Sequence, residues 1–289
     1  RDLAAMGGTP ESAVVAVALP PDRPGLADEL LAGLLECADR FACPLVGGDT
    51  STGPELFLAV TVTGRADHPV LRSGASPGET VFVTGPLGAA AAILDQLARG
   101  DHVTDADALH RPLPRLGEGR AAGAAGATAM LDLSDGLAVD LPRIAGASGV
   151  GIDLEEVPAA EGATPAQSRG GGDDYELCFT APPSSAPEVV AAAERSGVTV
   201  TRIGRIENPG DLQKALGPAD VRVTFSRPCR AARSEREVGL TGGLQVELLV
   251  GLVGVVERPA VAELLVDVHA VLGNEAHAAR HAGVGEGPV

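Results

Sequence analysis

The chain has 289 residues and a formal net charge of −17, which argues against a general nucleic-acid-binding protein because such proteins need a basic face. No run of about 18 uncharged apolar residues predicts a membrane span, and the four Cys lack the C-x-x-C spacing of common zinc sites and disulfide scaffolds. We therefore expect a reduced, cytoplasmic protein without a nucleic-acid or membrane partner. Lys214 is the only lysine, so a Walker P-loop is excluded.

Strands and helices alternate along the first part of the chain. Apolar and β-branched runs predict strands over 13–19, 44–46 and 56–63. Leucines at helical spacing predict a helix over 26–41. A Pro-Gly pair at 77–78 marks a turn and a domain break near 65–78.

The same alternation continues after the break and indicates an α/β fold. The predicted strands and helices cover 80–85, 88–99, 128–133, 135–147, 175–181, 186–197 and 198–204. Residues 209–289 do not continue the pattern and form an atypical tail, which is either disordered, a lineage-specific extension or a stretch not translated in the natural frame.

The stretch LDLSDGL places Asp132, Ser134 and Asp135 where an apolar strand meets a helix. Ser134 would cap the helix, and Asp135 would lie in its first turn, where the helix dipole favours negative charge. This interpretation leaves Asp132 unexplained, because a buried carboxylate needs a partner or a cation.

Two further acidic stretches follow glycines. In VGGDTSTG, a Gly-rich turn in which Asp49 bonds its own backbone is the favoured interpretation, although Gly48 would also let a phosphate approach closely. In GGGDDYEL, the acids Asp173, Asp174 and Glu176 lie either in a flexible turn or beside a positive group.

Ligands of α/β proteins bind at the carboxyl ends of strands, so these stretches are expected to converge there with Asp2. Clustered carboxylates stay ionised only with cations, and Mg²⁺ prefers such oxygen ligands. Without a P-loop lysine, this pattern indicates metal-assisted phosphoryl transfer from ATP. Arg72 is either a phosphate ligand or a surface residue, and HRPLPR (110–115) is interpreted as a solvated loop.

Six motifs occur in a characteristic order: DLAAMGG, LVGGDTSTGP, RSGASPGETVFVTGPLG, RPLPR, LDLSDGLAVDL and GGGDDYELCFT. Over residues 1–206 the chain resembles the thiamine-monophosphate kinase family. This family belongs to the superfamily of aminoimidazole ribonucleotide synthetase and selenophosphate synthetase.

The resemblance implies a two-domain, aminoimidazole ribonucleotide synthetase-like α/β (α+β) fold with an incomplete N-terminal domain. Residues 1–66 would be the remainder of the ATP- and Mg²⁺-binding domain, 67–78 a linker, 79–208 the C-terminal domain and 209–289 the tail. It also implies a homodimer, and ATP-dependent phosphorylation of thiamine monophosphate to thiamine diphosphate by direct in-line transfer.

Site residues carry over from the resemblance position by position, with no side chain acting as nucleophile or base. Several Mg²⁺ ions would be bound by Asp2, Asp49, Asp132 and Asp135. ATP would contact Gly48, Asp49, Arg72 and Ser134. Asp173 would face the thiamine substrate, at a position where the family usually has the longer Glu.

The family's N-terminal segment, with its Gly-Asp-Asp and Ser-Thr-Asp motifs, and its aromatic-Asp-His-Phe ending are absent from this sequence. We therefore expect impaired activity. The alternatives are another ATP-using member of the superfamily, such as a hydrogenase-maturation or aminoimidazole ribonucleotide synthetase-like enzyme, and a non-catalytic nucleotide-binding homologue.

Overall fold

A computed structural model of the chain describes residues 1–209 and the backbone of two strands, 222–223 and 246–256. The rest of the tail expected at 209–289 lies outside the described residues. The chain forms two compact units, one of residues 1–10 and 64–248 and one of residues 11–63 and 249–289. We name them the six-stranded unit and the four-stranded unit after their sheets.

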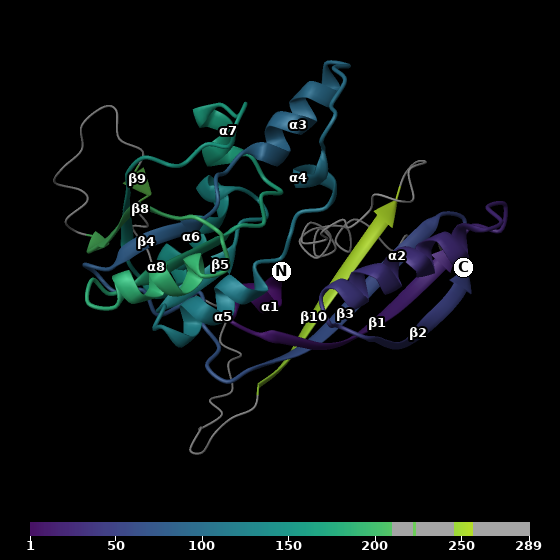
Figure 1. Cartoon of the computed structure of the whole chain (residues 1–289), viewed down its shortest axis with the longest axis horizontal. Helices are drawn as coiled ribbons and strands as arrows, with labels where there is room; N and C mark the ends of the chain where they lie inside the picture. The colour runs from purple at the N-terminus through teal and green to yellow at the C-terminus, as the bar shows by residue number, and fades with distance from the viewer. Residues whose placement is uncertain (210–221, 224–245, 257–289) are drawn as a thin grey trace, which may run out of the picture. The chain divides into compact units, whose positions relative to one another are not determined.

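The six-stranded unit is a sheet with helices on both faces (Figure 1). Its strand order is β5-β7-β4-β8-β6-β9. All its strand pairs with a described register are antiparallel. Its strands are β4 (Thr80–Thr84), β5 (Ala129–Asp132), β6 (Gly151–Leu154), β7 (Leu177–Ala181), β8 (Val200–Glu207) and β9 (Arg222–Val223). Its helices are α1 (Asp2–Ala5), α3 (Ala89–Ala98), α4 (Asp107–His110), α5 (Leu116–Ala124), α6 (Leu137–Ser148), α7 (Pro165–Gly170) and α8 (Ala186–Glu194).

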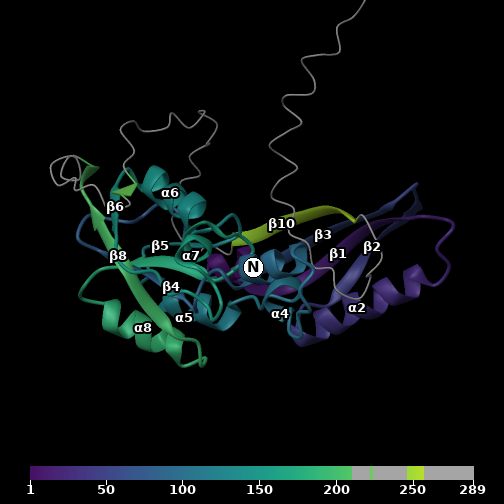
Figure 2. The ribbon, with the colours of Figure 1, turned by 90° about the horizontal axis from the view of Figure 1, so that it is seen from above.

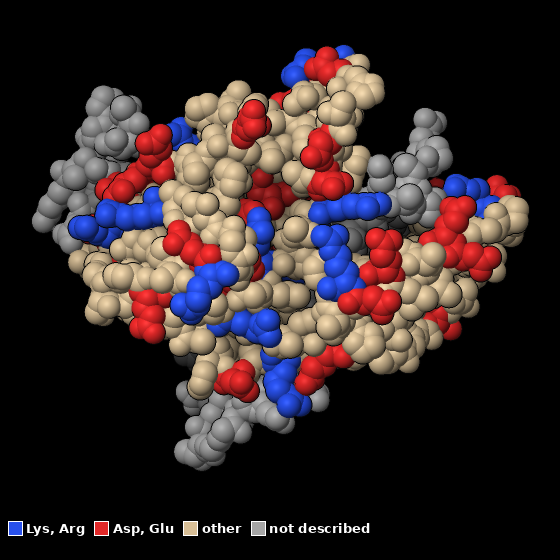
Figure 3. All heavy atoms as spheres, viewed as in Figure 1, with Lys and Arg blue, Asp and Glu red and all other residues tan. Residues whose placement is uncertain are grey.

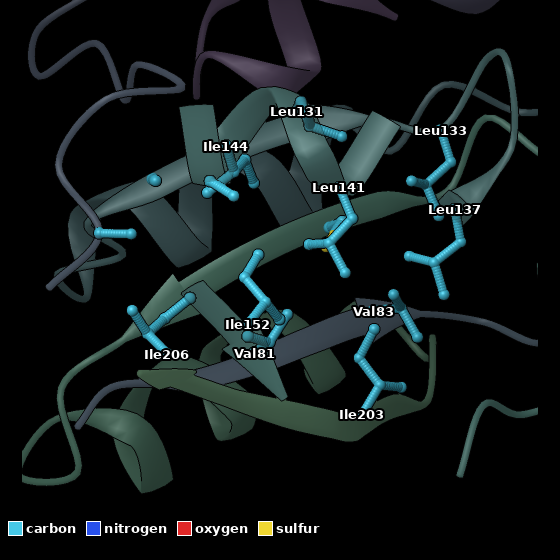
Figure 4. Packing of buried hydrophobic residues seen from close by; sticks show 14 of the residues in the cluster. Val81, Val83, Leu131, Leu133, Leu137, Leu141, Ile144, Ile152, Ile203 and Ile206 are labelled. Carbon is cyan, nitrogen blue, oxygen red and sulfur yellow. The ribbon is translucent and has the colours of Figure 1, made fainter. Parts of the chain in front are cut away.

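Alternation along β4 shows how this sheet buries both faces. Val81 and Val83 belong to the cluster that includes Leu141 and Ile144 of α6 (Figure 4). Phe82 points the other way, into a cluster with α5 and α8, where its ring stacks on Phe179 at 5.5 Å between centroids. Figure 2 shows α6 and α8 on opposite sides of this sheet. Successive side chains of a strand alternate between faces, so an apolar run such as VFV fits a strand covered on both sides.

The four-stranded unit has the strand order β10-β3-β1-β2. Its elements are β1 (Thr9–Leu19), α2 (Leu26–Arg40), β2 (Leu45–Thr52), β3 (Leu56–Ala66) and β10 (Val246–Val256). β1 and β2 pair in parallel, and α2 is the helix that connects them. A crossover helix of this kind is what a parallel pair requires.

The backbones of β1 and β2 approach so closely that only glycine fits at position 48. Gly48 pairs with Val15, and a Cβ at Gly48 would lie 1.8 Å from the Val15 carbonyl oxygen. The expected Gly-rich turn after a strand over 44–46 is therefore wrong, because β2 continues through Gly48 and Asp49 to Thr52.

The α/β (α+β) class and the aminoimidazole ribonucleotide synthetase-like fold are confirmed for the described residues, although α1, α4, β6, α7 and the two tail strands β9 and β10 were not predicted. The domain boundaries derived from the sequence stay a prediction. No helix among residues 1–209 has the length and apolar character needed to cross a membrane. On the face drawn in Figure 3, side chains of both charges are interspersed.

Candidate functional site

Two loops of the six-stranded unit are joined by backbone hydrogen bonds next to the β5–β7 pair. The amide of Asp173 donates to the Ser134 carbonyl at 2.8 Å, and the amide of Tyr175 donates to the Leu133 carbonyl at 2.8 Å. In the sheet, Asp132 at the end of β5 is paired with Leu177 at the start of β7. The structure therefore joins the loop of Asp132, Ser134 and Asp135 to the loop of Asp173.

The interpretation of Ser134 as a helix cap is wrong. Helix α6 begins at Leu137, and its N-cap is Gly136, with φ 98° and no side-chain cap. A Cβ at Gly136 would lie 2.6 Å from the Gly171 carbonyl, so the two loops pack too tightly for any other residue. Ser134 Oγ instead lies 3.4 Å from Asp135 Oδ1. Ser134 and Asp135 are therefore loop residues, and helix capping does not account for them.

Asp135 is held from two sides by residues of α6. Its amide donates to Oδ2 of Asp140 at 2.8 Å, and its carboxylate pairs with the Arg143 guanidinium. Arg143 also donates to Oδ1 of Asp140 at 2.5 Å. Asp140 is fully buried, and this burial raises the pKa of its carboxyl. This arrangement fixes both the backbone and the side chain of Asp135.

The segment around Asp173 has an unusual backbone. Asp173 and Tyr175 adopt φ values of 63° and 51°, a region that bulky residues rarely occupy. The Tyr175 hydroxyl lies 2.8 Å from Asp173 Oδ1. The guanidinium of Arg1 lies 3.5 Å from the centroid of the Tyr175 ring, so the neighbouring residue Asp2 starts α1 beside this segment.

A buried ion pair lies directly after this segment, and the sequence interpretation missed it. Arg115 makes a two-point contact with Glu176, including Nε to Oε2 at 2.7 Å. Thr84 Oγ1 donates to the same carboxylate at 2.6 Å. The hydrogen bond to Glu176 is the main reason why the pKa of Arg115 is raised. The solvated-loop interpretation is therefore wrong for Arg115. The signal was Glu176 beside the apolar run LCF, because a buried acid needs a partner.

The other predicted site residues are not part of this loop pair. Arg72 has an exposed side chain, and its carbonyl accepts from Ser148 Oγ at 3.2 Å. Leu71, beside it, accepts from the Met130 amide of β5 at 2.9 Å. Gly48 and the exposed Asp49 lie in β2 of the four-stranded unit.

The donor set of the loop pair fits Mg²⁺ only with ligands from outside the protein. Among the described residues there is no group of three or more His, Cys, Asp or Glu side chains that could hold a metal. Mg²⁺ is usually bound through one or two carboxylates, with waters and substrate phosphates completing its octahedron. Asp132 and Asp135 meet that smaller requirement.

Comparison with known families first defines the class of protein to which the chain belongs. Residues 1–66 match the N-terminal domain of AIR synthase related proteins, and residues 76–215 match the C-terminal domain. Two relatives narrow this class. Thiamine-monophosphate kinase from Rhodopirellula baltica is 34% identical over 242 residues, which are 78% of this chain and 71% of that protein. The enzyme from Halobacterium salinarum is 37% identical over 230 residues, which are 75% of this chain and 77% of that protein.

Solved structures agree with the sequence comparison. Thiamine-monophosphate kinase from Stenotrophomonas maltophilia superposes with a TM-score of 0.65 at 34% identity, covering 72% of each chain. A complex of AaThiL with AMPPCP and TMP superposes with a TM-score of 0.63 at 27% identity, covering 71% of this chain and 70% of that one. The chain belongs to the thiamine-monophosphate kinase family.

Proposed function

We propose that the chain transfers the γ-phosphoryl group of ATP to thiamine monophosphate and so forms thiamine diphosphate. The observation that carries the proposal is the hydrogen-bonded loop pair, which holds Asp132, Ser134 and Asp135 next to Asp173. It is supported by the relatives above and by the AMPPCP and TMP named in the AaThiL complex. AMPPCP is an analogue of ATP.

In this proposal one group of residues binds Mg²⁺ and another binds ATP. Asp132 and Asp135, with Asp2 and Asp49, would hold Mg²⁺. Gly48, Asp49, Arg72 and Ser134 would contact ATP. Bound Mg²⁺ supplies the positive charge that neutralises the transferred phosphoryl group.

The chain's own residues contribute position rather than covalent chemistry. Asp140 and Arg143 hold Asp135 in one place, and a bound cation would share its carboxylate with the Arg143 guanidinium. Asp173 would orient the thiamine end of the acceptor, so that the acceptor phosphate faces the γ-phosphorus in line. Positioning of two bound reactants removes much of the entropic barrier to their reaction.

Turnover and binding, measured together, test this proposal. Purified protein is incubated with Mg·ATP and a panel of phosphorylated acceptors, and thiamine diphosphate is quantified. We expect product from thiamine monophosphate alone, and a loss of kcat/KM on the order of 100-fold in Asp135→Asn. The exposed Asp101→Asn is the matched control and should behave as wild type.

Because the sequence predicts impaired activity, calorimetry with Mg·ATP measures binding independently of turnover. Binding should be lost in Asp49→Asn and retained in Asp101→Asn. Transfer to a different acceptor, or full activity in Asp135→Asn, would overturn the proposal. Sedimentation of the same samples tests the homodimer that we also propose.

A further inference from the structure

Asp174 lies between two residues with strained backbones. Asp173 on one side and Tyr175 on the other both have positive φ. Such conformations persist only where the surrounding structure enforces them, and they cluster at functional sites. The contacts of Asp174 therefore matter for the residue that precedes it.

The side chain of Asp174 contacts the N-terminus of helix α3. Its Oδ1 accepts the amide of Gly88, the N-cap of the ten-residue helix α3, at 2.8 Å. Gly88 has φ 91°, and a Cβ there would lie 2.7 Å from the Ser168 amide nitrogen of α7. A carboxylate at a helix N-terminus is stabilised by the helix dipole. Three separate segments thus meet at this carboxylate.

The second oxygen of the same carboxylate has an unfavourable environment. Oδ2 of Asp174 is buried and has no hydrogen-bond partner among the described residues. Burial raises the pKa of Asp174 to about 7, with the nearby carboxylates of Glu176 and Asp173 adding to the shift. The amides of Gly88 and Ala89 oppose it. A buried acceptor without a partner lowers the stability of the fold. We therefore infer that the Asp174 carboxylate has a role other than stabilising the fold.

We propose that Asp174 is a positioning residue whose carboxylate pins residues 173–175 to the N-terminus of α3 and so sets where Asp173 meets the thiamine substrate. The identity of the substrate rests on the proposed function. The pin acts together with the two amide bonds from Asp173 and Tyr175 to the β5–α6 loop. The two amide hydrogen bonds hold the backbone of residues 173–175 against the β5–α6 loop, and the Asp174 carboxylate holds the same segment against the N-terminus of α3.

Kinetics of two variants test the pin. Asp174→Ala removes the acceptor, and Asp174→Asn keeps an acceptor oxygen without the charge. We expect Asp174→Ala to raise the KM for thiamine monophosphate about tenfold or more, while the KM for Mg·ATP changes less than about twofold. Asp174→Asn should recover part of the loss. Equal changes in both KM values, or no change in either, would contradict the positioning role.

The control variant removes the same kind of contact elsewhere. Asp105 accepts the amide of Asp107, at the start of α4, at 3.0 Å on the surface. Asp105→Ala should leave both KM values unchanged.

Hydrogen exchange separates this inference from the proposed function. In Asp174→Ala the amides of Asp173, Tyr175 and Gly88 should exchange at least about tenfold faster, while those of β4 stay protected. If these amides keep their protection, Asp174 is not a pin, whatever the enzyme does. If protection is lost but wild type phosphorylates a different acceptor instead of thiamine monophosphate, the pin stands and the proposed substrate is wrong.

Discussion

The two units bury their strands to very different degrees. In the six-stranded unit, β7 is buried along its whole length, and β4 is buried at four of its five positions. In the four-stranded unit, no residue of β2 is buried, and Val15 is the only buried residue of β1. The first unit depends on side chains packed on two faces, whereas the second depends more on its backbone pairing. The same kind of substitution should therefore change the stability of the two units by different amounts.

Backbone crowding in the four-stranded unit should produce the largest effect. Gly48→Ala places a Cβ 1.8 Å from the Val15 carbonyl, and neither backbone can move without breaking the β1–β2 pair. We expect a loss of at least about 4 kcal/mol in the free energy of unfolding of this unit. Urea unfolding, with hydrogen exchange over 11–19 and 45–52, measures it.

Gly47→Ala is the matched control for this substitution. A Cβ at Gly47 meets nothing within 4 Å, so this variant should unfold like wild type. The strands of the six-stranded unit should keep their protection in both variants. Equal destabilisation by Gly47→Ala and Gly48→Ala would refute the crowding argument.

A buried charge in the six-stranded unit gives the next effect. Arg115→Met keeps most of the side-chain volume but leaves the Glu176 carboxylate, 9% exposed, without its guanidinium partner. Removing one partner of a buried pair costs about 3 kcal/mol or more. Arg202→Met breaks a surface pair with Glu155 and should cost less than about 1 kcal/mol. If thermal and urea unfolding show equal destabilisation by Arg115→Met and Arg202→Met, burial does not determine how much an ion pair contributes to stability.

The smallest effect is a pH dependence at Asp174. Its carboxyl has a pKa of about 7 in the folded chain and an ordinary value of 3.8 when unfolded. Between these values the folded state keeps a proton that the unfolded state releases, so the free energy of unfolding falls as pH rises. Asp174→Asn cannot titrate there. From about pH 5 to pH 8, wild type should lose on the order of 1 to 2 kcal/mol relative to this variant, allowing for partial solvent screening.

Denaturation curves of wild type and Asp174→Asn at matched pH measure that difference. A constant gap across the range would mean that the carboxyl titrates normally.

The fold was predictable where periodicity and burial agree. The strands β4 and β7 and the helices α3 and α8 follow apolar patterns that match their observed burial, so their positions were close to those expected. β2 was cut short because its glycines are typical of turns, and only the close approach of β1 explains them. β6 and α1 have four residues each, too few to show a period.

The sequence predicted the acidic residues of the candidate site but not the residues that hold them in place. Short motifs singled out Asp132, Asp135 and Asp173 as candidates. Asp132 interrupts an apolar strand, whereas Asp173 follows three glycines and its role was inferred from the family resemblance. Arg143 was missed because it fits the polar face expected of an ordinary helix. Asp140 was missed although it lies three residues after Leu137 and four before Ile144, on the face that the structure buries. The sequence also assigned Ser134 to helix capping, a role that depends on a backbone geometry found instead at Gly136.

The aromatic content of the chain gives the Asp173–Tyr175 segment a practical property. Tyr175 is the only tyrosine, and the chain has no tryptophan. Nearly all intrinsic ultraviolet emission must therefore originate from one ring, which has the Arg1 guanidinium over its face and its hydroxyl 2.8 Å from Asp173 Oδ1. Wild-type protein carries a single-site optical reporter, so ligand arrival at Asp173 can be followed by fluorescence without attaching a dye.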